Sequence, residues 1–143
     1  MIYTENTIKA MSIAYDAHNR QYDKCGIPYI YHPIIVAEQM KDEKSIIVAL
    51  LHDVVEDTDI SLEYLSSIFD TEIINAIDAI TRRDNEKYFD YIKRVKQNNI
   101  ARKVKIADIK HNMQQDRFDL IQSDKSYLSL LERYGNALRI LES

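Results

Sequence analysis

Two adjacent residues, His52 and Asp53, are the part of this chain best suited to do chemistry. They interrupt the stretch 46–55, which is otherwise apolar, and a helix that is apolar on nearly all sides is usually buried at the centre of its domain. Burying an imidazole beside an ionised carboxylate costs free energy unless a partner compensates both groups. A divalent cation would compensate them, so the pattern predicts a metal site.

Two acidic residues follow at helical spacing. Glu56 lies three residues after Asp53 and four after His52, and Asp57 lies four after Asp53, which places all four side chains toward one side of a helix. Acidic groups at the C-terminal end of a helix oppose its macrodipole and therefore need another reason to be there. The alternative is that these acids form a solvated helix end without a function.

Two more ligands must come from elsewhere in the chain to close a metal site. His32 is one candidate, because it follows a loop rich in helix breakers and precedes Pro33, which suits the first position of a helix. Asp108, within the stretch KVKIADIKHNM, is the other candidate. Each has a simpler explanation when taken alone, since His32 fits a helix cap and Asp108 fits an ion pair with Lys105 or Arg102. Only the joint pattern favours a metal.

The elements that must position these residues are all expected to be helices. The chain has only two glycines and two prolines and lacks the Asn-Gly and Asp-Gly pairs of tight hairpins, while apolar residues recur at helical spacing. The fold class is therefore all-α, with one irregular loop at 21–32. Helices are expected near 5–20, 33–40, 43–56, 61–69, 71–82, 86–97, 100–113 and 124–141. Four residues are expected to cap helices through their side-chain oxygens: Asp42, Ser61, Thr71 and Asp124.

The composition limits the class of protein. A chain of 143 residues fits a single domain, expected to span 1–143, and a net charge of −4 disfavours binding to duplex nucleic acid. The single cysteine, Cys25, agrees with a reducing cytoplasm. No apolar run is long enough for a bilayer span, so no membrane partner is expected and the protein is expected to be cytoplasmic.

Three segments resemble one known family, the HD-domain phosphohydrolases, and within it the hydrolase domain of the RelA/SpoT group, which includes small stand-alone hydrolases of guanosine tetraphosphate. KCGIPYIYHPIIVAEQM is similar to that group's loop with a metal-binding His-Pro. ALLHDVVEDT is similar to its central helix, and KVKIADIKHN to its late metal-binding segment. The resemblance implies a compact multi-helix HD-domain bundle with a metal site at its centre.

The resemblance also implies roles for individual residues. It assigns the metal, usually Mn²⁺, to His32, His52, Asp53 and Asp108. It implies that Glu56 and Asp57 position or deprotonate the attacking water. The expected reaction is hydrolysis of the 3′-pyrophosphate of guanosine tetra- or pentaphosphate, a small-molecule nucleotide, to GDP or GTP and pyrophosphate.

Four residues are expected to contact the substrate. The resemblance implies that Lys24 packs near the guanine base and that Asn112 contacts the ribose and phosphate region. Tyr29, in the loop just before His32, is expected to border the substrate with its ring. Lys105 is expected to clamp phosphate oxygens, since a cation beside a metal favours a pyrophosphorylated substrate.

Other histidines and cations have two interpretations. His18 and His111 fit hydrogen-bonded core residues, which is the more common role of a lone histidine on an apolar face. Arg102 and Lys103 either add positive charge near the metal or are ordinary surface charges.

The chain departs from the family pattern where the base would bind. Asp23 stands where a basic residue is usual, a basic side chain is missing or shifted by one place at 109–110, and Gln115 stands where threonine is common. The segment between Arg83 and Ile100 is shorter than in typical members. Two alternatives therefore remain open. One is an HD phosphohydrolase acting on an adenosine pyrophosphate, a phosphorylated dinucleotide cofactor or a nucleoside monophosphate, and the other is a non-catalytic regulator that binds a nucleotide or a metal.

Overall fold

The computed structural model describes residues 1–114 and 125–143, with side chains described to 114 and from Tyr127 onward. Within these ranges the regular elements are helices, and one isolated bridge joins Tyr22 and Pro28, so the all-α prediction is confirmed. None of the described helices combines the length and apolar character needed to cross a membrane. The helices are α1 (Glu5–Ala17), α2 (Tyr31–Glu38), α3 (Glu43–Leu51), α4 (Val54–Asp57), α5 (Leu62–Ser66), α6 (Thr71–Ile80), α7 (Tyr88–Lys96), α8 (Asn99–Asn112) and α9 (Lys125–Glu142).

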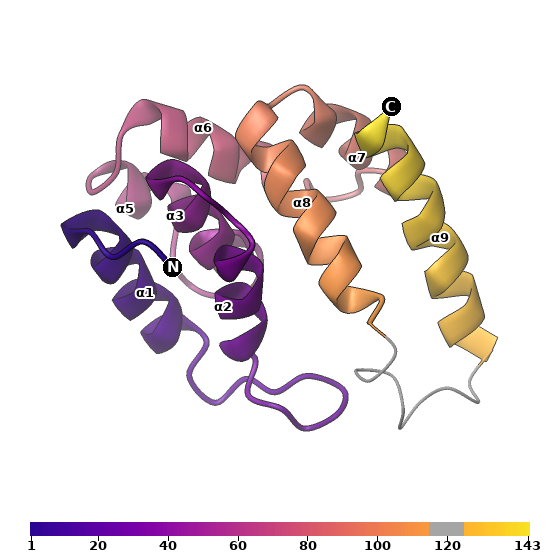
Figure 1. Ribbon diagram of the computed structural model, residues 1–143, viewed down its shortest axis with the longest axis horizontal. Helices are drawn as coiled ribbons and strands as arrows, with labels where there is room; N and C mark the ends of the chain where they lie inside the picture. The colour runs from indigo at the N-terminus through magenta and orange to yellow at the C-terminus, as the bar shows by residue number, and fades with distance from the viewer. Residues whose placement is uncertain (115–124) are drawn as a thin grey trace.

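Helix α3 lies at the centre of the hydrophobic core. Its residues 46–51 are fully buried, and it packs against α1, α2, α6 and α8. Figure 1 shows α1, α2 and α3 on one side of α8, with α9 on the other side. Helix α8 contacts α2, α3, α6, α7 and α9 and so connects the two sides of the fold. A residue on the inner face of α8 can therefore meet residues from α2 and α3.

Side-chain caps fix the start of several helices. The carboxylate of Asp42 accepts a hydrogen bond from the Ser45 backbone N–H at 2.9 Å, and Ser61 caps α5 in the same way, so both predictions are confirmed. The prediction that Thr71 caps the next helix is wrong by one residue. Asp70 is the cap, since its extended backbone lets its carboxylate reach the Ile73 N–H at 3.0 Å. The expected cap Asp124 lies outside the described residues.

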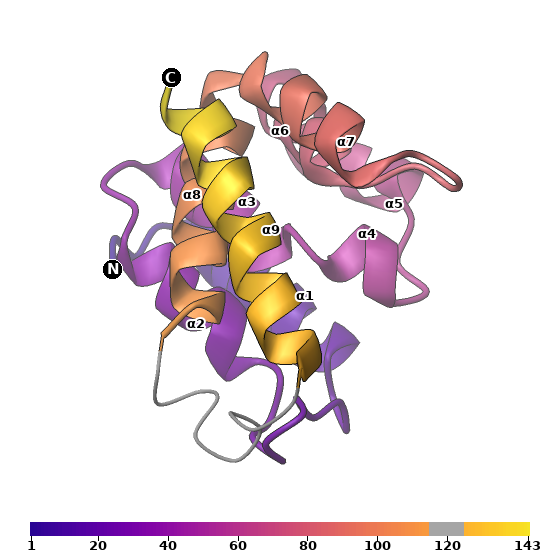
Figure 2. The same cartoon turned by 90° about the vertical axis from the view of Figure 1, so that its right-hand side faces the viewer.

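The predicted helix 43–56 is interrupted at the two residues of greatest chemical interest. Helix α3 ends at Leu51 and α4 begins at Val54, with His52 and Asp53 in the turn between them. Asp53 has φ −106° and ψ −2°, which leaves the regular helical path. Figure 2 shows α4 set apart from the end of α3. The turn, rather than the regular rotation of one continuous helix, sets the directions of these two side chains.

Helix α2 begins two residues earlier than the sequence predicts. Tyr31 is its first residue, so His32 lies inside the first turn and Pro33 takes the third helical position rather than the first. Proline is still tolerated there, because the N–H groups of the first turn have no partner within the helix. His32 is thereby held by a helix rather than by a free loop.

Candidate metal centre

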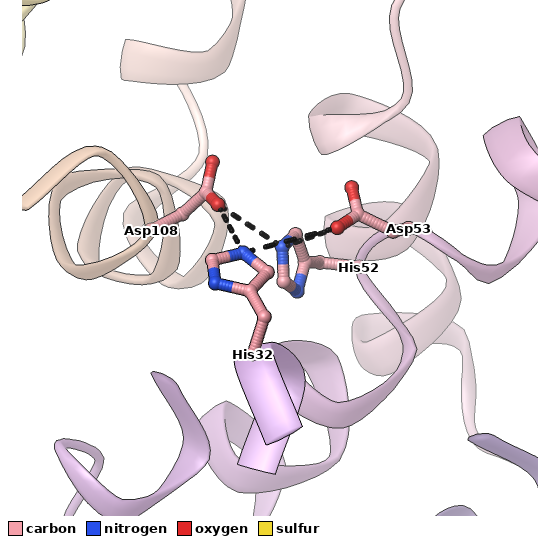
Figure 3. A group of neighbouring side chains, drawn as sticks. All are labelled: His32, His52, Asp53 and Asp108. Carbon is pink, nitrogen blue, oxygen red and sulfur yellow. Dashed lines mark hydrogen bonds and ion pairs between the residues drawn. The ribbon is translucent and has the colours of Figure 1, made fainter. Parts of the chain in front are cut away.

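Four side chains that are distant in the sequence converge between α2, α3 and α8. His32 comes from α2, His52 and Asp53 from the turn after α3, and Asp108 from α8. Figure 3 shows the two imidazoles between the carboxylates of Asp108 and Asp53. Each of the four offers one ligand atom, and these atoms all lie within 4.8 Å of one another. The structure therefore brings together the four residues that the sequence singled out as metal ligands.

His52 has one nitrogen engaged and one aimed at the cluster. Its Nδ1 lies 2.6 Å from the Ala49 carbonyl oxygen, so Nδ1 carries the hydrogen and donates it. Its Nε2 lies 3.0 Å from Asp53 Oδ2 and 3.3 Å from Asp108 Oδ1. This nitrogen is buried and makes no well-aligned hydrogen bond to any described residue. A buried ring nitrogen that faces two carboxylates, in a ring whose other nitrogen is held by a backbone carbonyl, is typical of a histidine that binds a metal.

His32 contacts a second histidine, His111, through the ring nitrogen that faces away from the cluster. Its Nε2 lies 2.7 Å from Asp108 Oδ1, and its Nδ1 lies 2.7 Å from Nδ1 of His111. The His32 and His111 rings are stacked, with centroids 5.0 Å apart and planes 15° apart. His111 is a buried, hydrogen-bonded residue, as expected, but its contact with His32 was not predicted. The spacing between Asp108 and His111 on α8 is the sequence signal, because three residues place both on one helical face.

The charges around the cluster favour ionised carboxylates. Burial opposes ionisation of Asp108, but the Lys105 ammonium, the hydrogen bond with His32 and the nearby His52 ring hold its pKa well below the usual range. Burial likewise opposes ionisation of Asp53, and the adjacent His52 lowers its pKa to about 2. The same two carboxylates raise the pKa of His52 against the effect of burial. Two buried negative charges thus share a small space, which attracts a cation.

The donor set fits a divalent metal. Two imidazole nitrogens and two carboxylate oxygens form a mixed nitrogen and oxygen set of the kind that manganese, iron or zinc accepts. Two aspartates offset the charge of such an ion, and four protein ligands leave positions for water or substrate in an octahedral shell. The buried Nε2 of His52 would gain the partner that it lacks among the described residues.

Glu56 and Asp57 lie beside this cluster. Asp53, Glu56 and Asp57 each offer a carboxylate oxygen within 4.8 Å of the others. Glu56 Oε1 accepts a hydrogen bond from the Arg82 backbone N–H at 2.9 Å, which fixes its position. Although Asp57 is exposed, partial burial of its carboxylate and the charges of Asp53 and Glu56 raise its pKa to about 6. Such a carboxylate is ionised at neutral pH and basic enough to accept a proton.

Three of the four expected substrate residues touch the cluster directly. The Tyr29 hydroxyl donates a hydrogen bond to Asp53 Oδ2, and burial together with that negative charge raises the pKa of Tyr29. Lys105 Nζ lies 2.9 Å from Asp108 Oδ2, and Asn112 Nδ2 lies 3.3 Å from Asp108 Oδ1. Lys24 is exposed and makes no hydrogen bond or ion pair with the described part of the chain.

Arg102 and Lys103 turn out to be structural or surface charges. Arg102 Nε donates to the carbonyl oxygen of Leu141, and Lys103 Nζ lies 3.4 Å from Asp42 Oδ2. Neither contact reaches the carboxylates of the cluster. The cation that the sequence analysis missed is Arg82, which lies in the loop between α6 and α7 next to Glu56.

The fold and the buried histidine and aspartate cluster define a helical metal-binding domain, and comparisons with known proteins agree. The HD domain family matches residues 10–121, and the chain belongs to that family. It is 33% identical to the guanosine-3′,5′-bis(diphosphate) 3′-pyrophosphohydrolase of Borreliella burgdorferi over 92% of this chain and 23% of that protein. It is 42% identical to a probable enzyme of the same name from Synechocystis over 52% of this chain and 10% of that protein. This chain spans less than a quarter of the length of either relative.

A solved structure supports the fold. It is described as "A metazoan ortholog of SpoT hydrolyzes ppGpp and plays a role in starvation responses", and it matches with a TM-score of 0.71 at 23% identity. The match covers 97% of this chain and 88% of that one. The predicted resemblance to the HD domains of the RelA/SpoT group is confirmed.

Proposed function

We propose that this chain is a metal-dependent phosphohydrolase that removes the 3′-pyrophosphate of guanosine tetra- or pentaphosphate and releases GDP or GTP and pyrophosphate. One observation carries the proposal. Ligand atoms of His32, His52, Asp53 and Asp108 lie within 4.8 Å of one another, directly beside the paired acids Glu56 and Asp57. The relatives that carry the name of this activity support the choice of substrate.

The four residues hold the metal, for which we propose Mn²⁺, although another divalent ion would fit the same donors. Such an ion polarises a phosphoryl group and lowers the pKa of a bound water. Glu56, held by the Arg82 N–H, orients the attacking water, and an oxygen of the Asp57 carboxylate accepts its proton. A positioned base of this kind contributes about 10²–10⁴-fold to the rate.

The remaining contacts orient the ligands and the substrate. Tyr29 holds Asp53 by its hydroxyl and borders the nucleotide with its ring, while Lys105 and Asn112 hold Asp108 and face the phosphates. Lys24 extends from its loop toward the base. Residues 1–143 act as one catalytic domain, and we place the reaction in the cytoplasm, where the single cysteine would stay reduced.

The test is an assay of the purified chain with guanosine tetraphosphate and Mn²⁺. We expect GDP and pyrophosphate in equal amounts, loss of turnover on chelation, and recovery when Mn²⁺ is added back. The Asp53→Asn variant serves as the inactive control. Release of single phosphates, or no turnover by protein shown to contain metal, would contradict the proposed reaction.

A second candidate substrate is favoured by one contact in the loop between α1 and α2. The Asp23 carboxylate accepts hydrogen bonds from the backbone N–H groups of Cys25 and Ile27 at 2.8 and 3.0 Å. An acid that structures its own turn cannot stack on a guanine as an arginine can. This contact weakens the case for guanine, and the alternative is hydrolysis of another nucleotide, such as an adenosine pyrophosphate, a phosphorylated dinucleotide cofactor or a nucleoside monophosphate. Comparing kcat/KM for the guanosine and adenosine substrates separates the two, and tight binding of both without turnover would indicate a regulator.

A further inference from the structure

Two arginines from different parts of the fold lie over one tyrosine ring. The guanidinium carbons of Arg82, in the loop between α6 and α7, and of Arg133, on α9, lie 5.6 and 3.7 Å from the centre of the Tyr88 ring. Among the described residues, neither arginine has a carboxylate within ion-pair distance. Two guanidinium groups thus contact one ring without a carboxylate partner in the described ranges, and an anion bound by both would supply the missing counter-charge.

Two neighbouring arginines, in contrast, each form an ion pair with a carboxylate. Arg83, the next residue, lies 3.1 Å from Asp78 Oδ1, and Arg94 lies 3.0 Å from Glu86 Oε1. The guanidinium of Arg82 instead donates through Nε and Nη2 to the backbone carbonyl of Glu86. This carbonyl orients the side chain of Arg82 but does not neutralise its charge.

The arginine pair adjoins the candidate metal centre. On one side the backbone N–H of Arg82 binds Glu56. On the other side the Tyr88 ring lies 6.2 Å from that of Tyr91, and Lys105 Nζ lies 5.3 Å from the Tyr91 ring. Lys105 in turn binds Asp108. Figure 2 shows α8 on one side of α9 and α7 on the other side, beside the upper part of α9, and α9 contacts both helices.

The Tyr88 hydroxyl supplies an independent observation. Its oxygen is buried, yet it has no hydrogen-bond partner in the described ranges. Buried polar groups are normally paired, and an unpaired one in a native protein is often completed by a ligand. Tyr134 lies in the same region, since burial and the charge of Asp108 raise its pKa while Lys105 and Arg133 act in the opposite direction.

We infer that Arg82, Arg133 and Tyr88 form a second phosphate subsite beside the metal centre, which binds a phosphate group of the substrate other than the one under attack. A guanidinium stacked on a ring keeps N–H groups at its edge for phosphate oxygens, and two such groups suit a multiply charged ligand. The substrate class is a nucleotide with two separate phosphate chains. The identity of that substrate rests on the proposed function, whereas the affinity of the subsite for a pyrophosphate does not.

The first experiment measures binding of inorganic pyrophosphate to the full chain by calorimetry, with and without Mn²⁺. Arg82→Gln keeps the backbone N–H that holds Glu56, and we expect it and Arg133→Gln each to weaken binding about tenfold or more. Tyr88→Phe keeps the ring and removes only the hydroxyl, so we expect a smaller loss. Arg83→Gln and Arg139→Gln are matched controls that remove the same charge nearby, and we expect both to bind like the wild type.

The second experiment compares guanosine 3′-pyrophosphates that carry a 5′-diphosphate, a 5′-monophosphate or no 5′-phosphate. We expect the wild type to prefer the 5′-diphosphate through a lower KM, and the two arginine variants to lose that preference. Normal hydrolysis with unchanged pyrophosphate binding in both variants would overturn the subsite and leave the proposed function standing. If pyrophosphate binding depended on the two arginines but none of these nucleotides were hydrolysed, the subsite would stand and the proposed function would be overturned.

Discussion

The candidate metal centre differs from residues 19–28 of the loop between α1 and α2, here called the 19–28 loop, in how it is held, although both face the expected substrate. His32, His52 and Asp108 are 2 to 4% exposed and are fixed by contacts from three helices. In the loop, Tyr22 is 64% and Ile27 42% exposed. The Asp23 carboxylate holds the turn from within by accepting bonds from the Cys25 and Ile27 N–H groups, and the Gln21 side chain connects the loop to His18 and to the Asp57 carbonyl oxygen. Under the proposed function, we expect the core to set the chemistry and the loop to set the choice of nucleotide.

This division has a physical basis. A ligand packed against α3 and α8 cannot change without leaving a buried charge or a cavity, which is costly. An exposed loop connects the same helices whatever its composition, so it tolerates changes that alter recognition. The departure from the family pattern at Asp23 falls in the loop, and the departure at 109–110 lies on α8 beside Asp108 but replaces none of the four candidate ligands.

If the metal centre sets the chemistry and the loop does not, the largest loss of metal and turnover is expected for Asp53→Ala. This change removes a carboxylate that faces both His52 and Tyr29, so we expect loss of bound metal and at least about a 10³-fold loss of turnover, since the metal supplies several kcal/mol. Metal is measured by elemental analysis of the purified variant. Asp59→Ala is the matched control, because it removes an exposed acid from the same segment. Full metal content in the Asp53 variant would show that the ligand set is wrong.

The next largest effect is expected for the paired acids. Glu56→Gln and Asp57→Asn should each reduce kcat by about 10²–10⁴-fold while metal content stays normal, because these groups act on the water. Steady-state kinetics with elemental analysis on the same samples tests this. Glu63→Gln, an exposed acid on α5, should behave like the wild type. Unchanged kcat in both variants would remove the assigned catalytic role.

His111→Ala tests whether the metal centre depends on the contact behind His32. Residues that hold a metal-binding histidine typically contribute 10–100-fold to metal affinity, so we expect a loss of about that size. Turnover at saturating Mn²⁺ should recover, since His111 is a positioning residue. Titration of the metal-free chain with Mn²⁺ measures the affinity. A variant with wild-type affinity and reduced turnover would indicate a direct role in the reaction instead.

Asp23→Ala tests the loop side of the comparison. It removes two hydrogen bonds that shape the turn, so we expect KM to rise by about tenfold or less, with kcat and metal content unchanged. Asp23→Asn keeps a side-chain oxygen that can accept both bonds and should stay close to the wild type. If Asp23→Ala lost metal, the loop and the metal centre could not be treated as separate.

The sequence predicted the grouping of the four candidate ligands better than the contacts around them. Apolar spacing and caps located the helices, and the burial of 46–51 follows from their unbroken apolar character. The break at His52 and Asp53 could not be predicted, because no glycine or proline marks it. In that turn His52 contacts the Ala49 carbonyl oxygen and Asp53 contacts the Tyr29 hydroxyl. The second contact joins residues 24 positions apart and therefore depends on tertiary packing.

Several contacts that the sequence did not predict join distant segments. His111 meets His32 only because α8 packs against α2, and Arg133 meets Tyr88 only because α9 packs against α7. Arg82 lies in a loop, where periodicity carries no information about direction. Residue types and spacing within one element were therefore informative, whereas pairings between elements required the structure.

The smallest expected effect concerns the loop between α6 and α7. Unlike the 19–28 loop, it is held in place by an ion pair between Glu86 and Arg94. Glu86 accepts hydrogen bonds from Arg94 Nε and Nη2 at 3.0 Å, and these, against the effect of burial, lower its pKa from 4.5 to about 2. Because the folded-state pKa is the lower one, this stabilisation is present above pH 4.5 and is lost as the pH falls toward 2. Glu86→Gln should therefore lower the free energy of unfolding at neutral pH by about 1 kcal/mol, and the difference from wild type should shrink across that window. Urea unfolding measures it, with the exposed Asp84→Asn as control, and a difference that stays constant with pH would show that the carboxylate charge does not hold the loop.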